Sequence, residues 1–200
     1  MGGTLSFDGI LPLPGLIHEL HALKASYSSP GYPIGPKSAE RDSPMIAVVQ
    51  RVLSASVTVE KPAYSACIEG GLLVLLGVAT GDDDAAADWM AGKLARLRVF
   101  KDEEERMNRS VLDTGGQILL VSQFTLLGNT AKGNRPSFIQ AAEPTLGEHL
   151  YQQVAEILRQ AHGLDVKTGL FGAMMQVQLV NDGPVTLIVN TPPSKLEGGA

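Results

Sequence analysis

The sequence predicts an α/β fold in a single domain, with a mainly antiparallel sheet and helices packed on it. β-rich apolar runs stand before, between and after two segments with helical periodicity. The chain has 200 residues, the size of one ordinary domain or slightly more. Its composition is 44% hydrophobic and 18% charged, which supplies a core and excludes a wholly disordered chain.

The first strands are expected directly after Met45. Residues 46–52 are rich in β-branched side chains, and residues 55–59 repeat the apolar alternation after a short break. We expect these two runs to form a hairpin. Residues 72–78, LLVLLGV, are continuously apolar, so both faces of that strand should be covered.

Two helices are expected on the sheet. The aspartates at 82–84 precede the first, residues 85–97, where the helix dipole favours negative charge. A Mg²⁺ or Ca²⁺ loop is the alternative, but three consecutive carboxylates lack the every-second-residue spacing of a calcium loop. The second helix follows Pro144, carries one apolar stripe and ends at Gly163. Strands over residues 117–124, 174–180 and 185–190 complete the pattern.

The chain divides at Met45. Six of the twelve prolines precede it, and residues 27–37 are almost entirely Ser, Gly, Pro and Tyr. This composition favours an unstructured extension over residues 1–44, with a short helix over 16–24. A partner-binding or targeting role for the extension is the alternative. Residues 45–192 form the predicted domain and residues 193–200 a frayed tail. Either Met1 or Met45 begins the working protein.

Charge and cysteine content narrow the function classes. The net charge of -5 repels phosphate, which disfavours wrapping of a long duplex and leaves room for a small basic site. Cys67 is the only cysteine, so the chain cannot form an internal disulfide or a thiolate-rich zinc site. We interpret Cys67 as a core residue and expect a cytoplasmic location. No apolar run reaches the roughly 18 residues of a membrane span, and residues 1–16 lack a secretory pattern.

The common catalytic motifs are missing. HExxH, GxSxG, GxxxxGK[ST] and GxGxxG do not occur, which removes the main support for metalloprotease, α/β-hydrolase and nucleotide-binding functions. The histidines are interpreted as structural or solvated, because no two of those in the predicted domain are near each other. They are His18, His21, His149 and His162.

Two short motifs carry the functional signal. Residues 122–126, SQFTL, end an apolar strand, and residues 181–186, NDGPVT, separate two strand runs. Taken singly, each would be an ordinary strand end or tight turn. In this order, and with GNRPSF at 133–138 and MIAVVQRV at 45–52, they closely resemble the D-aminoacyl-tRNA deacylase family. The resemblance extends over about residues 45–189; the extension, the tail and a slightly long segment at 60–67 depart from it.

The resemblance implies an enzyme that hydrolyses the ester between a D-amino acid, or glycine, and the terminal adenosine of tRNA. Its partners are therefore D-aminoacyl-tRNA and glycyl-tRNA, and it needs no cofactor or metal. It implies a homodimer with active sites at the subunit interface, each combining one chain's SQFTL with the other chain's Gly-Pro step. The catalytic residues are then Ser122, Gln123, Phe124 and Thr125. Backbone N–H groups around residues 123–125 are the expected oxyanion donors.

In this family the step that corresponds to Gly183-Pro184 is cis and faces the α-carbon of the substrate. Its main chain would accept hydrogen bonds from the α-ammonium group and occupy the space of an L side chain. Glycine has no side chain and would escape this rejection. A trans bond would instead fit a relaxed relative that tolerates some L-aminoacyl substrates.

Several further residues are assigned supporting roles by the resemblance. Arg51 would brace the Gly-Pro loop beside Asn181, the alternative being a surface arginine. Phe138 and Met174 or Met175 would line the adenosine pocket, or otherwise belong to the core. Basic residues near the motifs are candidates for tRNA phosphate contacts, chiefly Lys132 and Arg135, with Lys101, Arg106 and Arg109 beside them; the alternative is scattered solvated charge.

Two questions stay open at the level of sequence. Thr125 could act as nucleophile, but no base is assignable, so we favour activation of water by the neighbouring ribose hydroxyl of the tRNA. The alternative function is a non-catalytic dimer that binds tRNA ends or a protein partner.

Overall fold

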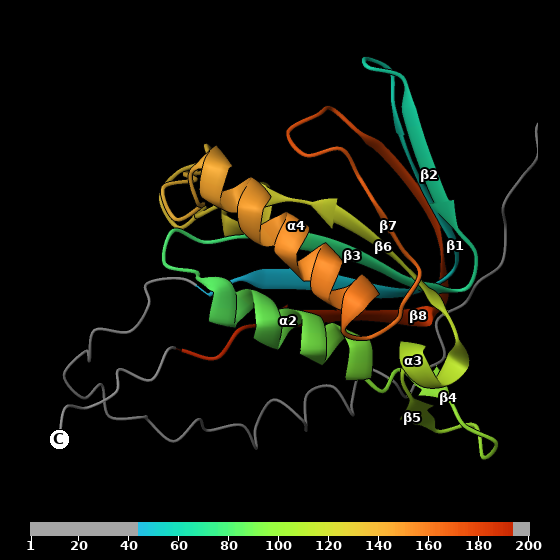
Figure 1. Cartoon of the computed structure of the whole chain (residues 1–200). Helices are drawn as coiled ribbons and strands as arrows, with labels where there is room; N and C mark the ends of the chain where they lie inside the picture. Colours follow the sequence, from blue (N-terminus) through green and yellow to red (C-terminus); the bar gives the residue numbers. More distant parts are fainter. Residues whose placement is uncertain (1–43, 194–200) are drawn as a thin grey trace, which may run out of the picture. The chain divides into compact units, whose positions relative to one another are not determined.

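The computed structural model describes residues 44–193 (Figure 1). The expected extension and tail, apart from Pro44 and Pro193, lie outside these residues, as do His18, His21 and the helix predicted at 16–24. A six-stranded sheet has the order β2-β1-β3-β6-β7, with β8 paired to β1. Its strands are β1 (Ile46–Val59), β2 (Tyr64–Ile68), β3 (Gly71–Gly77), β6 (Gln117–Ser122), β7 (Val166–Thr168) and β8 (Gln176–Asn190).

The sheet is mixed, so the prediction of a mainly antiparallel sheet is corrected. Strand β1 is antiparallel to β2, β3 and β8. Strand β6 is parallel to both β3 and β7. The reason lies in the connections: helices intervene between β3 and β6 and between β6 and β7, and a crossover of this kind returns the chain in the same direction.

Helices α2 (Asp84–Arg96) and α4 (Pro144–Gln160) pack side by side on one face of the sheet (Figure 1). Both expected helices are confirmed. Asp83 caps α2 by accepting a 2.9 Å hydrogen bond from the backbone N–H of Ala86, which confirms capping by the acidic run. The main core lies between these helices and alternate residues of β1, β3 and β6.

The opposite face of the sheet is also covered. Strand β2 lies near β6 and β7, and the hydroxyl of Tyr64 donates to the backbone oxygen of Thr168 at 2.6 Å. A second cluster of buried residues on this face includes Leu73, Leu119 and Val121. The central strand β3 is therefore buried on both faces, as its continuous apolar run predicts.

Two expected breaks in strands are corrected. Residues 46–59 form one strand, β1, and the apparent hairpin break is a β-bulge at Leu53, which falls between the pairs Val52↔Asn181 and Ser54↔Val180. Residues 176–190 likewise form one strand, β8, that passes through the Gly-Pro step. A bulge interrupts the apolar alternation just as a turn does, which explains both errors.

Short elements were not predicted. They are β2, β7, the two-stranded pair β4 (Phe100–Lys101) and β5 (Met107–Arg109), and α3 (Val111–Thr114) with its capping box between Ser110 and Asp113. Cys67 lies in β2 and is exposed, which corrects its interpretation as a core residue.

Candidate active site

The SQFTL segment begins at the end of a buried strand. Strand β6 ends at Ser122, two residues earlier than expected, and a short 3₁₀ helix, η1 (Phe124–Leu127), follows. The N–H of Gln123 donates to the backbone oxygen of Leu76 in β3 at 2.7 Å. Gly77 permits this close approach, since a Cβ there would lie 3.0 Å from the oxygen of Gln123 and 3.3 Å from the Cβ of Leu126. The segment is thus held directly on β3.

This anchoring decides which backbone amides are available. The N–H of Gln123 is already used, so it is not available as an oxyanion donor. Within residues 44–193, the N–H groups of Phe124 and Thr125 have no hydrogen-bond acceptor, as is usual at the start of a helix. Two of the three expected donors therefore remain.

A pocket of about 700 Å³ lies against this segment. Ser122, Gln123, Phe124 and Thr125 line it together with Met174 and Met175 from the segment before β8. Phe138 is outside the lining but packs edge-to-face on Phe124, with ring centroids 5.2 Å apart. The structure therefore brings together all four residues assigned to catalysis and both methionines, with Phe138 supporting one wall.

The pocket is mainly apolar, and its chemistry is limited. Tyr151 is the one titratable residue among the described residues that line it. Burial raises the pKa of Tyr151 well above its ordinary value, and its hydroxyl lies 2.8 Å from the backbone oxygen of Leu120 and 3.2 Å from that of Gly169. The hydroxyl of Thr125 accepts a hydrogen bond from the side-chain amide of Gln123. No described residue of this lining is placed to act as a general base near neutral pH.

The Gly-Pro step lies in an irregular part of β8. Between the pairs Gln50↔Thr186 and Val52↔Asn181, one residue of β1, Arg51, faces residues 182–185 of β8. The Gly183-Pro184 peptide bond is cis. Gly183 has φ +131°, and a Cβ there would lie 2.9 Å from Val185 Cγ2 and 3.0 Å from an Arg51 guanidinium nitrogen. Only glycine fits this position without displacement.

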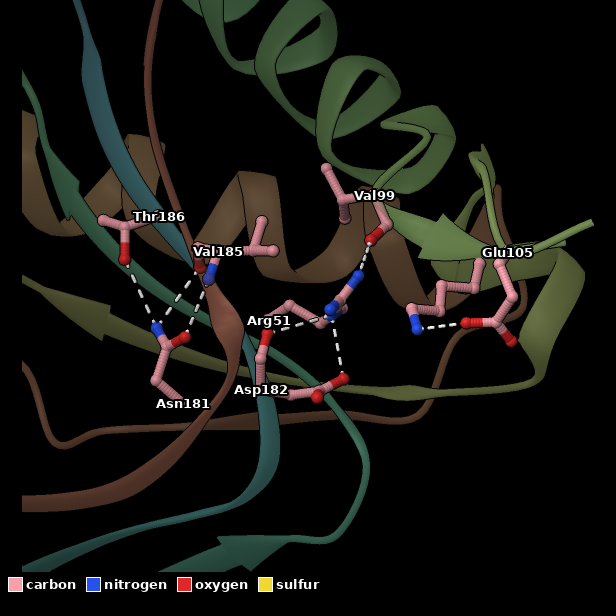
Figure 2. A network of polar contacts seen from close by, with 8 residues as sticks. Arg51, Val99, Glu105, Asn181, Asp182, Val185 and Thr186 are labelled. Atoms are coloured by element: carbon pink, nitrogen blue, oxygen red, sulfur yellow. Dashed lines mark hydrogen bonds and ion pairs between the residues drawn. The ribbon is translucent and has the colours of Figure 1, made fainter.

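The side chains of Arg51 and Asn181 hold residues 182–185, the loop of β8 that contains the Gly-Pro step (Figure 2). Arg51 is buried at 5% exposure, rather than on the surface, and bridges the loop to the backbone oxygen of Val99. Its Nε lies 2.9 Å from a carboxylate oxygen of Asp182 and 3.1 Å from the backbone oxygen of the same residue. Asn181 accepts from the N–H of Val185 at 2.8 Å and donates to its oxygen at 3.2 Å.

The two motifs do not meet within one chain. Neither Gly183, Pro184, Asn181 nor Arg51 lines the pocket at the SQFTL segment. This separation is what the expectation of a site shared between two chains requires.

The candidate phosphate contacts divide into two groups. Lys101 pairs with Glu105, Arg106 with Asp102 and Glu104, and Arg109 donates to the backbone oxygen of Asp113. These three therefore do not form a free basic patch. Lys132 and Arg135 lie on the exposed connection between η1 and Phe138 and make no ion pair within residues 44–193.

The described residues offer neither a cluster of metal ligands nor a membrane-spanning helix. Within the described part of the chain, no three or more His, Cys, Asp or Glu side chains are grouped so that they could hold a metal ion. None of the helices in residues 44–193 has the length and apolar character to cross a membrane.

Most of the described chain is similar to known proteins. The family model for D-Tyr-tRNA(Tyr) deacylase matches residues 48–190. The chain is 56% identical to a D-aminoacyl-tRNA deacylase of Myxococcus xanthus over 148 residues, which are 74% of this chain and 95% of the relative. It is 54% identical to that of Opitutus terrae over 147 residues, 74% of this chain and 97% of the relative.

Solved structures show the same fold. One, named c-Myc DNA Unwinding Element Binding Protein, is 42% identical with a TM-score of 0.68, and the match covers 74% of this chain and 99% of that one. A probable eukaryotic D-amino acid tRNA deacylase has a TM-score of 0.65 at 20% identity, over 73% and 98% of the two chains, and supports the fold alone. On the strength of the family model and of relatives matched over nearly their whole length, the chain belongs to the D-aminoacyl-tRNA deacylase family.

Proposed function

We propose that this protein hydrolyses the ester bond of D-aminoacyl-tRNA and of glycyl-tRNA, releasing the amino acid and free tRNA. The observation that carries the proposal is the SQFTL segment, which presents two unpaired backbone N–H groups beside a mainly apolar pocket of about 700 Å³. The relatives at 54–56% identity bear the name of this activity.

The amides of Phe124 and Thr125 would stabilise the reaction's developing charge. When water attacks the ester carbonyl, its oxygen becomes an oxyanion, and fixed N–H donors lower the barrier most where bulk water is excluded. Loss of one such donor typically costs about 10²–10³ in rate. The anchoring of Gln123 to β3 keeps the two neighbouring amides in position.

The proton of the attacking water would go to the substrate. The described lining of the pocket offers no carboxylate, imidazole or amine, and the Tyr151 hydroxyl is buried between two backbone oxygens. The ribose hydroxyl next to the ester is then the nearest group able to orient or deprotonate water. The protein would act mainly by positioning the ester and stabilising the oxyanion.

The complete site would form in a homodimer. Strand β8 is paired only on its β1 side within residues 44–193, and exposed apolar side chains lie along it, Leu179, Val180, Leu187 and Ile188. An edge strand of 15 residues with such side chains favours pairing with another chain. In the proposed dimer, the Gly-Pro step of one copy, which lies on β8, would meet the SQFTL pocket of the other.

Chiral selection would come from main-chain atoms. In the proposed site, backbone oxygens of Gly183 and its neighbours would accept hydrogen bonds from the α-ammonium group. The same backbone would occupy the space that an L side chain needs. Arg51 and Asn181 support this proposal because they fix the backbone on both sides of the step.

The acceptor end of tRNA would contact Lys132 and Arg135.

The test is hydrolysis of D-tyrosyl-, L-tyrosyl- and glycyl-tRNA by the purified protein, compared with spontaneous hydrolysis of each. Release from the D-tyrosyl and glycyl substrates alone supports the proposal. Release from all three indicates a relaxed relative. No release above the spontaneous rate would leave a non-catalytic binding dimer and overturn the proposed function.

A further inference from the structure

The backbone nitrogen of Met45 faces two buried oxygen acceptors. It lies 3.1 Å from Oδ1 of Asp82 and 3.1 Å from Oγ1 of Thr191. Met45, Asp82 and Thr191 are 0%, 6% and 4% exposed, respectively. One of the two acceptors is a carboxylate, so the nitrogen of Met45 lies beside a negative charge at a position shielded from water.

Both acceptors are fixed by the fold. The other carboxylate oxygen of Asp82 accepts from the N–H of Ala79 at 2.7 Å, and the N–H of Asp82 donates to the oxygen of Ala79 at 3.1 Å. Thr191 directly follows β8, and its N–H donates to the backbone oxygen of Met45 at 3.0 Å. The segments before β1, after β3 and after β8 therefore assemble this site.

The number of protons distinguishes two forms of this nitrogen. Inside a longer chain it is a neutral amide with a single N–H, which two acceptors must share. At a chain start it is an α-ammonium group with three N–H donors and a positive charge. The ammonium can serve Asp82 and Thr191 with separate protons, and its charge is attracted to the carboxylate across a poorly hydrated gap.

The side chain of Met45 also supports this residue as the first of the working protein. It is fully buried in the main core, which accommodates a methionine, the residue with which translation begins, at this position. The Opitutus terrae relative has no extension of comparable length, because 147 residues of this chain already cover 97% of that protein.

We propose that Asp82 and Thr191 form a binding site for the α-ammonium group of Met45, and that the working form of the protein begins at this residue. The site is independent of the reaction and of the dimer, so the failure of one proposal leaves the other standing.

The first experiment identifies the N-terminus in the organism that makes the protein. Free α-amines are labelled in a cell extract before digestion, and mass spectrometry identifies the first peptide. The expected result is a labelled peptide that begins at Met45. A protein that begins predominantly upstream of Met45 would overturn the proposal.

The second experiment measures the amine itself in a chain that begins at Met45, which has nearly the length of the relatives. The rate of acylation of the α-amine at pH 8 is compared with that of a short peptide of the same first residues. Ion pairing with a buried carboxylate keeps an amine protonated and unreactive, so acylation of the folded protein should be slower by on the order of tenfold.

Variants assign that protection to the named groups. Asp82→Asn should raise the acylation rate toward that of the peptide, and Asp84→Asn, which removes an exposed carboxylate two residues away, should leave it unchanged. Thr191→Val provides a second test if Asp82→Asn does not fold, and it should raise the rate as well. Acylation of the parent chain as fast as the peptide, or failure of that chain to fold, would overturn the proposal.

Discussion

Arg51 Nε donates to the backbone oxygen of Asp182 at 3.1 Å and lies 2.9 Å from the carboxylate of the same residue. A buried side chain of β1 thereby holds the one part of β8 that leaves its register. The guanidinium also donates to the backbone oxygen of Val99, so the loop is linked to the segment after α2. The position of the Gly-Pro step thus depends on a residue that does not itself line the pocket.

Replacement of Arg51 should destabilise the protein and disorder the loop. Arg51→Met leaves the oxygens of Val99 and Asp182 without their donor, and we expect a loss of about 2–4 kcal/mol in the free energy of unfolding. Arg51→Lys keeps the charge but lacks the planar set of donors and should recover only part of the loss. Urea unfolding measures both variants. An unfolding free energy within about 0.5 kcal/mol of the parent protein for Arg51→Met would show that the bridge does not support the loop.

Gly183→Ala should affect selectivity more strongly than overall stability. The new Cβ would contact Val185 and Arg51 at 3.0 Å or less, at a φ that L residues rarely adopt, so we expect a cost of about 1–3 kcal/mol. Because its loop is displaced, the variant should hydrolyse D-tyrosyl-tRNA more slowly than the parent protein and lose part of its preference for D-tyrosyl-tRNA over L-tyrosyl-tRNA. Gly163→Ala is the matched control, since that glycine lies in neither motif and also has a positive φ, but has open space around its Cβ position. Equal D-to-L ratios in both variants would argue against selection by the Gly183 backbone.

Elements of the fold that depend on neighbouring residues can be predicted from the sequence, whereas those that depend on contacts between distant segments cannot. Helix α2 follows from local signals, because Asp83 caps the turn that begins beside it. The pairing of β6 with β3 and β7 depends on the path of distant connections, which periodicity does not contain. The bulges at Leu53 and at residues 182–185 interrupt the alternation as turns do, and only the partner strand distinguishes the two.

The site shows the same division. Resemblance identifies the SQFTL and Gly-Pro motifs. It does not show that the backbone N–H of Gln123 is already bonded to the backbone oxygen of Leu76, because that hydrogen bond joins residues 47 positions apart. The pairing of Lys101 and Arg106 with acidic neighbours is a local effect that the charge pattern KDEEER could have indicated. Sequence spacing alone did not separate these paired cations from Lys132 and Arg135.

Charge reversal at Lys132 and Arg135 should weaken tRNA binding. The double variant Lys132→Glu/Arg135→Glu removes two candidate phosphate contacts, so the slope of log affinity against log salt should fall in magnitude by about 1–2. Lys101→Glu/Arg106→Glu changes the net charge equally, and those cations already pair with acids, so it should have a smaller effect. Binding to tRNA is measured by fluorescence anisotropy at several salt concentrations. Equal slopes for the two double variants would contradict the assignment.

Acid should weaken the capping box at α3. Hydrogen bonds from the backbone and hydroxyl of Ser110 hold the pKa of Asp113 below its ordinary value of 3.8. A lowered folded-state pKa means that the carboxylate stabilises the fold above the unfolded value, and that this stability is lost as the pH falls through the folded value. Asp113→Asn should therefore be less stable than the parent at pH 6, with the difference shrinking below pH 3.8. A urea-midpoint difference that does not change between pH 6 and pH 2.5 would contradict this expectation.

Thr125→Ala separates the two routes for attack on the ester. The Thr125 hydroxyl accepts from the Gln123 amide, and no described residue lining the pocket is a base that could activate it. If the ribose hydroxyl assists water, Thr125→Ala should retain single-turnover hydrolysis of D-tyrosyl-tRNA within about tenfold of the parent rate, because the backbone N–H of residue 125 is unchanged. Thr125→Ser, which keeps the hydroxyl, is the control. Loss of all activity in Thr125→Ala with retained substrate binding, alongside an active Thr125→Ser, would instead assign the nucleophile to Thr125.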